Sequence, residues 1–160
     1  RFAEAVEENG KPVDVEATAA GTLLHDVGRA LGDHDDHQRA GLKHLRKTPL
    51  APYGFACISH FTKGARPKAL RDAGVARDVV ADFRRLIDMS TLTWEERCAA
   101  LADACMKKDE PVRPKERFAD LRRRYDAAAL IDLQERRTAK IRKKLEAAIG
   151  EDPLRLVGLA

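Results

Sequence analysis

Apolar residues recur along this chain at intervals of three and four positions, the spacing that places them on one face of an α-helix. The clearest example is the set Val75, Val79, Val80, Phe83, Leu86 and Ile87. Val-, Ile- and Thr-rich segments with a period of two, typical of strands, are absent from the sequence. The pattern predicts an all-α protein, with helices over residues 2–8, 15–30, 37–47, 53–61, 75–87, 114–125 and 130–149, and one more beginning at residues 93–96.

Capping signals support several of these helices. Asp14 is a good N-cap for the helix over 15–30, and Asp35 or Asp36 suits the helix that begins at His37. The segment Thr93-Trp94-Glu95-Glu96 has the form of a capping box. The segment ATAAGTLL at residues 17–24 is so apolar that we expect the helix over 15–30 to be central and buried.

The last predicted helix, over residues 130–149, combines an apolar seam with many charges. Its segments QERR and KIRKK are expected on the solvated side, while the seam packs on the body of the protein or on a second subunit, which leaves a homodimer open. The seam residues are Leu130, Leu133, Ile141, Leu145 and Ile149.

Composition narrows the functional classes. The chain has 160 residues, enough for one domain, with 44% apolar and 35% charged residues. The net charge of +4 is small, and no aromatic residues interleave with the basic ones, so nucleic-acid binding is not indicated, whereas a small anionic substrate fits. Cys57, Cys98 and Cys105 form no CxxC pair and are expected as small core residues of a cytoplasmic protein. No apolar run suggests a membrane span.

Two positions indicate a metal site. His25-Asp26 follows an apolar segment, and Asp103 lies in the apolar run CAALADACM. A buried carboxylate without a partner is expensive, and a divalent metal accepts imidazole and carboxylate ligands together. The alternatives are a hydrogen bond between His25 and Asp26, and a pairing of Asp103 with a buried arginine such as Arg84 or Arg97.

These residues and their setting resemble the HD superfamily of metal-dependent phosphohydrolases. LLHDVGR is similar to the central motif of that superfamily, and LADACM to the segment that carries its final Asp. The resemblance covers about residues 5–125. It implies a single-domain helical bundle with His25, Asp26 and Asp103 as ligands, in which residues 1–128 form the HD-like domain and residues 129–160 a helical extension packed on it. The first His of the superfamily pattern is expected upstream of Arg1.

Further histidines extend the resemblance. His37 with Gly41 one turn later, followed by His60, is similar to the extra histidines of members with two metals. By that resemblance Asp26 bridges two ions, one held by His25, Asp103 and the upstream His, the other by His37 and His60. The cofactor would then be one or two divalent ions of Mn, Fe, Co, Ni or Zn.

Basic residues near the motifs are candidates for binding substrate. Arg29, Lys63 and Arg66 are placed to contact phosphate oxygens, although a solvated basic loop explains Lys63 and Arg66 equally well. His44 is expected to pack or face solvent. His34 is expected at the surface, within reach of a substrate.

The resulting hypothesis is a hydrolase of a small phosphate ester or nucleotide. A metal-activated water would attack phosphorus, with Asp26 or Asp103 orienting it or taking its proton. Two alternatives remain open, a di-iron oxygenase of the HD fold and a non-catalytic regulatory domain stabilised by metal.

Overall fold

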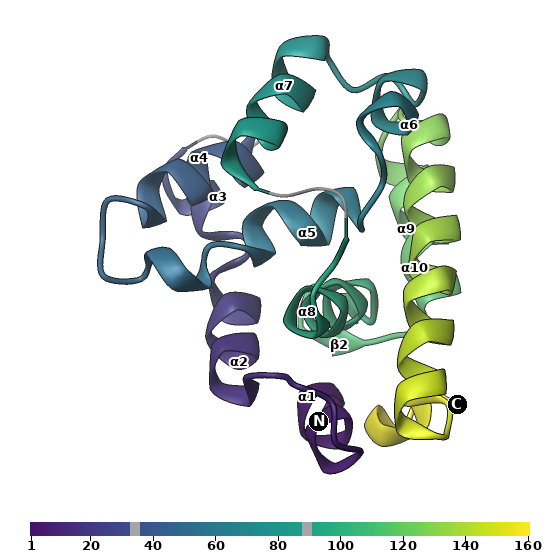
Figure 1. The fold of residues 1–160 in the computed structure, drawn as a ribbon. Helices are drawn as coiled ribbons and strands as arrows, with labels where there is room; N and C mark the ends of the chain where they lie inside the picture. Colours follow the sequence, from purple (N-terminus) through teal and green to yellow (C-terminus); the bar gives the residue numbers. More distant parts are fainter. Residues whose placement is uncertain (33–35, 88–90) are drawn as a thin grey trace.

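The computed structural model describes residues 1–32, 36–87 and 91–160, and helices dominate it (Figure 1). The predicted all-α class is confirmed, and a single hairpin of two-residue strands is the exception within the described residues. The elements are α1 (Phe2–Glu8), α2 (Val15–Leu24), α3 (Val27–Ala30), α4 (His37–Leu45), η1 (Ala51–Tyr53), α5 (Ala56–Thr62), α6 (Pro67–Asp72), α7 (Arg77–Leu86), α8 (Trp94–Ala104), β1 (Met106–Lys107), β2 (Glu110–Pro111), α9 (Pro114–Arg124), α10 (Ala128–Ile149) and η2 (Pro153–Val157).

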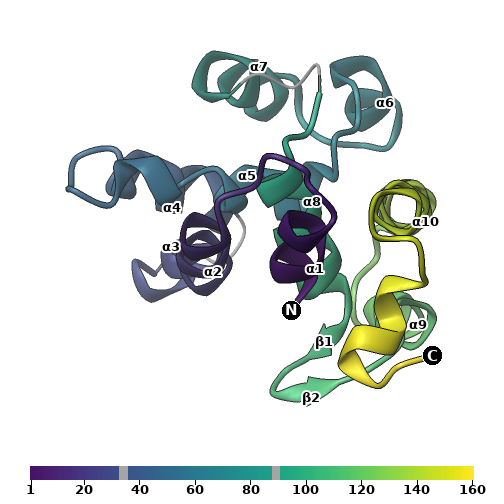
Figure 2. The ribbon, with the colours of Figure 1, turned by 60° about the horizontal axis from the view of Figure 1, so that its bottom comes forward.

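Helix α8 lies at the centre, between α2 and α5 on one side and α1 and α10 on the other (Figures 1 and 2). Its start matches the predicted capping box, because the Thr93 hydroxyl accepts from the backbone N–H of Glu96 while the Glu96 carboxylate accepts from that of Thr93. Small buried residues, among them Ala99 and Ala100, let the surrounding helices approach its backbone closely. Side chains late in α8 are therefore at least partly covered by the surrounding helices.

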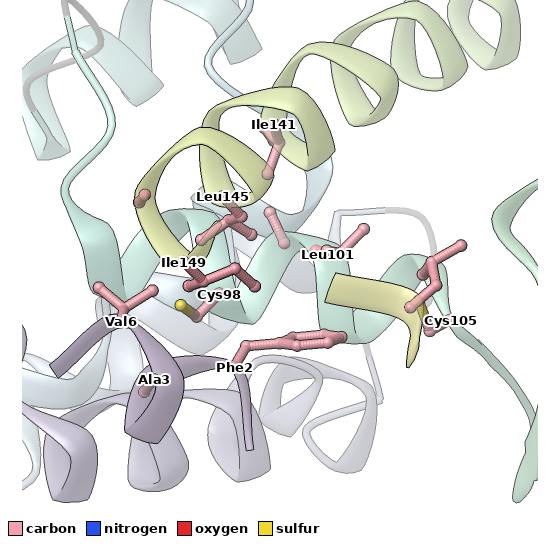
Figure 3. Close-up of a cluster of buried hydrophobic side chains, with 12 residues drawn as sticks. Phe2, Ala3, Val6, Cys98, Leu101, Cys105, Ile141, Leu145 and Ile149 are labelled. Atoms are coloured by element: carbon pink, nitrogen blue, oxygen red, sulfur yellow. The ribbon is translucent and has the colours of Figure 1, made fainter. Parts of the chain in front are cut away.

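Two main apolar clusters hold the helices together. The first joins α1, α8 and α10, with Phe2, Leu101 and Leu145 among its buried residues (Figure 3). The second joins α4, α5, α6 and α7 around Ile58 and Phe83. Burying each such side chain contributes roughly 1.5–3 kcal/mol, so these clusters fix the positions of the helix ends that lie between them.

The predicted helix over residues 15–30 is wrong in two respects. It is divided into α2 and α3 at His25 and Asp26, where Asp26 has a non-helical backbone with φ −104° and ψ 11°. It is also not buried, since Leu23 is 85% exposed. Only one narrow side of α2 is buried, where Thr18 and Gly21 lie and where Gly21 packs directly against the ring of Phe55. The alanines of α2 are small, so leaving them partly in contact with water costs little.

Further local differences concern the middle of the chain. The predicted helix over residues 53–61 is a 3-10 turn, η1, followed by α5. Helix α6, which begins at Pro67, and the β1–β2 hairpin were not predicted. The expected packing face of α7 is confirmed, because Val80 and Phe83 are buried there.

Helix α10 packs on the body of the protein through its predicted seam, in which Leu133, Ile141, Leu145 and Ile149 are buried. The prediction that QERR faces solvent is wrong for two of its residues. Gln134 donates to the Phe61 carbonyl at 2.8 Å, and Arg137 donates from Nε to the Lys63 carbonyl at 3.1 Å. Carbonyls at the end of a helix have no partner within it, so α10 supplies the missing donors for α5.

Within the described part of the chain, no helix has both the length and the apolar character needed to span a bilayer. The three cysteines are free and buried, as expected. Burial raises the pKa of each thiol to about 12, so none offers a thiolate at neutral pH.

Candidate metal centre

Five predicted site residues from separate elements meet beside α8. His25 ends α2, Asp26 precedes α3, His37 begins α4, His60 lies in α5 and Asp103 in α8. Nε2 of His25 lies 3.7 Å from Oδ2 of Asp26 and 3.7 Å from Oδ1 of Asp103. Oδ1 of Asp26 lies 3.0 Å from Nε2 of His37 and 3.7 Å from Nε2 of His60. The two carboxylates therefore share one set of surroundings.

The break between α2 and α3 turns His25 and Asp26 toward the other residues of the site. In a continuous helix, neighbouring side chains point about 100° apart, so His25 and Asp26 would not face the same point. The irregular backbone at Asp26 turns both side chains toward the same centre. The structural departure from the predicted long helix thus creates the site.

Backbone carbonyls set the tautomers of two of the histidines. Nδ1 of His25 lies 2.6 Å from the Thr22 carbonyl oxygen, and Nδ1 of His60 lies 2.7 Å from that of Ala56. A carbonyl oxygen only accepts, so in each neutral ring Nδ1 carries the proton and Nε2 keeps its lone pair. Both lone pairs are directed into the centre, which is the arrangement that metal-binding histidines adopt.

His25, Asp26 and His60 meet the spatial requirement for holding an ion. Each offers one ligand atom, and these atoms all lie within 4.8 Å of one another. Ligands at about 2.0–2.2 Å from a common ion lie at most about 4.4 Å apart, so a contraction of a few tenths of an ångström suffices. Two imidazole nitrogens and one carboxylate suit Mn, Fe, Co, Ni or Zn. The donor set present therefore fits a divalent transition metal.

The protonation states of Asp26, Asp103 and His60 also suit the binding of a metal ion. Burial raises the pKa of Asp26, but the close contact with His37 and the electrostatic effects of His25, His60 and Arg29 outweigh it, so the pKa lies well below its usual range. Burial likewise opposes ionisation of Asp103, and the Lys63 charge leads the effects that lower its pKa to about 2. Burial lowers the pKa of His60 to about 4. At neutral pH the centre therefore presents carboxylates and a neutral imidazole, the forms that bind metal.

Two glycines bring α3 and α4 into contact and so place His37. A Cβ on Gly28 would lie 1.9 Å from the His37 carbonyl oxygen, and one on Gly41 would lie 3.0 Å from the Gly28 nitrogen. The sequence singled out Gly41, one turn after His37, but gave Gly28 no role, although Gly28 stands within the LLHDVGR motif. Only a residue without a side chain allows the backbone contact at Gly28.

Lys63 belongs to the centre, which rules out the solvated-loop interpretation of this residue. It ends α5 in the left-handed conformation, with φ 46°, and is only 2% exposed. Its Nζ donates to Oδ2 of Asp103 and to the Ala100 carbonyl, both at 3.0 Å. Periodicity gave no sign of this burial, because Lys63 lies past the end of an apolar helix among other basic residues.

The remaining candidates lie at the edge of the centre or away from it. Arg29 donates from Nε to Oδ2 of Asp26 at 2.9 Å, with its side chain 42% exposed. Arg66 is exposed at the start of α6, where its charge acts on Arg137. His44 is exposed, as expected, and His34 falls outside the described residues.

The alternative partners of Asp103 that the sequence left open are wrong. Arg97 packs over the Trp94 ring at 4.7 Å, and Arg84 is exposed on the surface of α7. The partner is Lys63, as the hydrogen bond between them shows. The underlying expectation, that a carboxylate in this apolar helix has a cationic partner, is confirmed.

Fold and site together define a helical protein with a partly buried His/Asp cluster whose geometry suits a divalent metal ion. No protein-family model, curated protein sequence or solved structure matches this chain.

Proposed function

We propose that this chain is a metal-dependent phosphohydrolase with an HD-domain-like fold, acting on a small phosphate ester or nucleotide. The observation that supports the proposal most directly is the convergence of the His25 and His60 lone pairs with Asp26. At 3.7 Å these atoms are too far apart for hydrogen bonds, and neither partner has a proton to donate. A cation between them satisfies all three groups at once.

The ion, when bound, supplies Lewis acidity and makes water a stronger nucleophile at neutral pH. His37 holds Asp26 through the 3.0 Å contact between Nε2 and Oδ1 and so fixes the carboxylate on which the ion depends. Asp103 has one oxygen committed to Lys63 and the other directed toward His25. That second oxygen is suited to accept a hydrogen bond from the attacking water and hold it in line.

Arg29 is the residue best placed to contact the phosphate. Its side chain is partly exposed and reaches Asp26 at the edge of the centre. A guanidinium binds phosphate oxygens through paired hydrogen bonds, so a substrate bound there would present phosphorus toward the ion. Arg66 is exposed at the start of α6, and none of the ion pairs among the described residues joins it to a residue of the centre.

The test combines metal analysis with hydrolysis. Protein stripped by a chelator would be titrated with Mn²⁺, Co²⁺ and Zn²⁺ and assayed on a panel of nucleotides, phosphomonoesters and phosphodiesters. We expect metal-dependent turnover that His25→Ala and Asp26→Ala each reduce by at least about 100-fold, because each removes a ligand. His44→Ala, an exposed histidine outside the centre, is the matched control and should retain full activity.

Two results would count against the proposal in different ways. Hydrolysis that survives chelation and the His25→Ala change would refute metal dependence. Tight metal binding that requires His25, without hydrolysis of any substrate in the panel, would favour a regulatory domain stabilised by metal.

A further inference from the structure

The centre contains a buried cation that the proposed chemistry does not use. Lys63 is 2% exposed, and its ammonium group lies against Asp103 and the Ala100 carbonyl. Holding a lysine charge out of water is costly, so its burial here requires the Asp103 carboxylate. Conversely, Asp103 has its negative charge compensated before any metal ion arrives.

The backbone around Lys63 is fixed by groups distant in sequence. Residues other than glycine seldom adopt a left-handed conformation such as Lys63 has. Arg137 of α10 donates to the carbonyls of both Lys63 and Gly64, which holds this turn against α10. The backbone that carries the Lys63 side chain is therefore held against α10, and this positions the buried ammonium group beside Asp103.

The distances also distinguish Asp103 from the three possible ligands that lie closest together. His25, Asp26 and His60 form a set within 4.8 Å, and Asp103 is not part of it. Its Oδ2 is hydrogen-bonded to Lys63, which leaves only Oδ1, 3.7 Å from His25 Nε2, on the side of the histidines. A second divalent ion shared with Asp103 would lie close to the Lys63 ammonium and be repelled by it.

We propose that Lys63 takes the place of a second metal ion, so that the centre holds one divalent ion and Asp103 is the partner of Lys63 rather than a metal ligand. The inference rests on the proposed metal-dependent function and specifies its metal content and substrate charge. The positive charges of the centre come from one divalent ion, Lys63 and Arg29, and the negative charges from the carboxylates of Asp26 and Asp103. The positive charges exceed the negative ones by two. That charge matches the dianion of a phosphate monoester, whose second pKa is about 6.

Ion counting with Mn²⁺ alone tests this assignment without using activity. The full chain would be dialysed against Mn²⁺ and its metal content measured by mass spectrometry. We expect one ion per wild-type chain and two per Lys63→Met chain, because removing the ammonium frees Asp103 to hold an ion. Lys68→Met is the matched control, since Lys68 pairs with Asp72 at 2.6 Å on the surface, and it should keep one ion.

A double variant covers the case in which Lys63→Met does not fold. Combining Lys63→Met with Asp103→Asn removes both charges together. This double variant should bind one Mn²⁺ with a Kd within about threefold of wild type. When a metal site loses a supporting group, the expected loss of affinity is larger, about 10–100-fold. Two ions in the wild type, one ion in a folded Lys63→Met chain, or a large loss of affinity in the double variant would each overturn the assignment. A wild type that binds no ion would instead refute the proposed function itself.

Discussion

Substituting Gly28 by alanine tests how the fold places His37 on Asp26. The new methyl group would lie 1.9 Å from the His37 carbonyl oxygen, whereas real contacts of this kind are essentially never shorter than 3.0 Å. The backbones of α3 and α4 must therefore separate by about 1 Å. The contact of 3.0 Å between His37 Nε2 and Asp26 Oδ1 spans the same two segments and would lengthen with them.

The size of the effect follows from two opposed contributions. Forcing an extra methyl group into a packed site costs typically 1–3 kcal/mol. Replacing glycine by alanine within a helix returns up to about 1 kcal/mol, because the unfolded chain loses conformational freedom. Since the required displacement is of backbone atoms, we expect a net destabilisation of about 2 kcal/mol, which lowers the Tm of a domain of this size by roughly 4–8 °C.

Gly41→Ala provides the graded comparison across the same helix contact. Its added methyl group would meet the Gly28 nitrogen at 3.0 Å, so a shift of a few tenths of an ångström relieves it. The gain in helix propensity then offsets most of the strain, and we expect stability within about 0.5 kcal/mol of wild type. The two variants add the same methyl group and differ chiefly in the distance to the opposing backbone.

Urea unfolding of the metal-free protein gives the stability change, and Mn²⁺ titration gives the affinity change. For Gly28→Ala we expect Mn²⁺ affinity to fall roughly 10–100-fold, the usual effect of displacing a group that supports a metal ligand. A Gly28→Ala protein with wild-type stability and wild-type Mn²⁺ affinity would show that the α3–α4 contact does not determine the position of His37.

Three further outcomes follow from the structure. Burial lowers the pKa of His60 to about 4, so between pH 6.5 and 4 only the unfolded chain takes up a proton at this residue. The free energy of unfolding of the metal-free protein should therefore fall by up to about 3 kcal/mol as the pH is lowered over this range. Urea melts at several pH values should show this slope in the wild type and a flatter one in His60→Gln. Arg137→Ala removes the donors for the Lys63 turn and should destabilise by about 1–3 kcal/mol, whereas a thermal melt identical to wild type would contradict that role. Thr93→Ala breaks the capping box of α8 and should lower stability by about 1 kcal/mol without changing Mn²⁺ affinity, as calorimetry can check.

Local pattern was sufficient to predict much of this protein. The period of the apolar residues indicated helices, and the capping box at Thr93 marked the start of α8. The polar residues His25, Asp26 and Asp103 stood out because they interrupt apolar runs, and the structure brings them together. Each of these inferences depends on residues a few positions apart, for which helical geometry is enough.

Contacts between distant segments could not be predicted from local pattern. The burial of Lys63 depends on Asp103, 40 residues away, and on Arg137, 74 residues away. The inward direction of Gln134 depends on a carbonyl that the end of α5 leaves without a partner. Polar and charged residues on a helix normally face water, so the pattern of α10 alone gave no reason to direct Gln134 and Arg137 inward.

The sequence by itself determined an all-α chain with a small set of histidines and carboxylates in apolar surroundings, because helix formation and the cost of burying charge are properties of short segments. Only the tertiary structure decided that the chain breaks at Asp26, that Gly28 lets α3 and α4 touch, and that Lys63 neutralises Asp103. Those features arise from the packing of helices against one another, where each position is fixed by atoms that no local pattern contains.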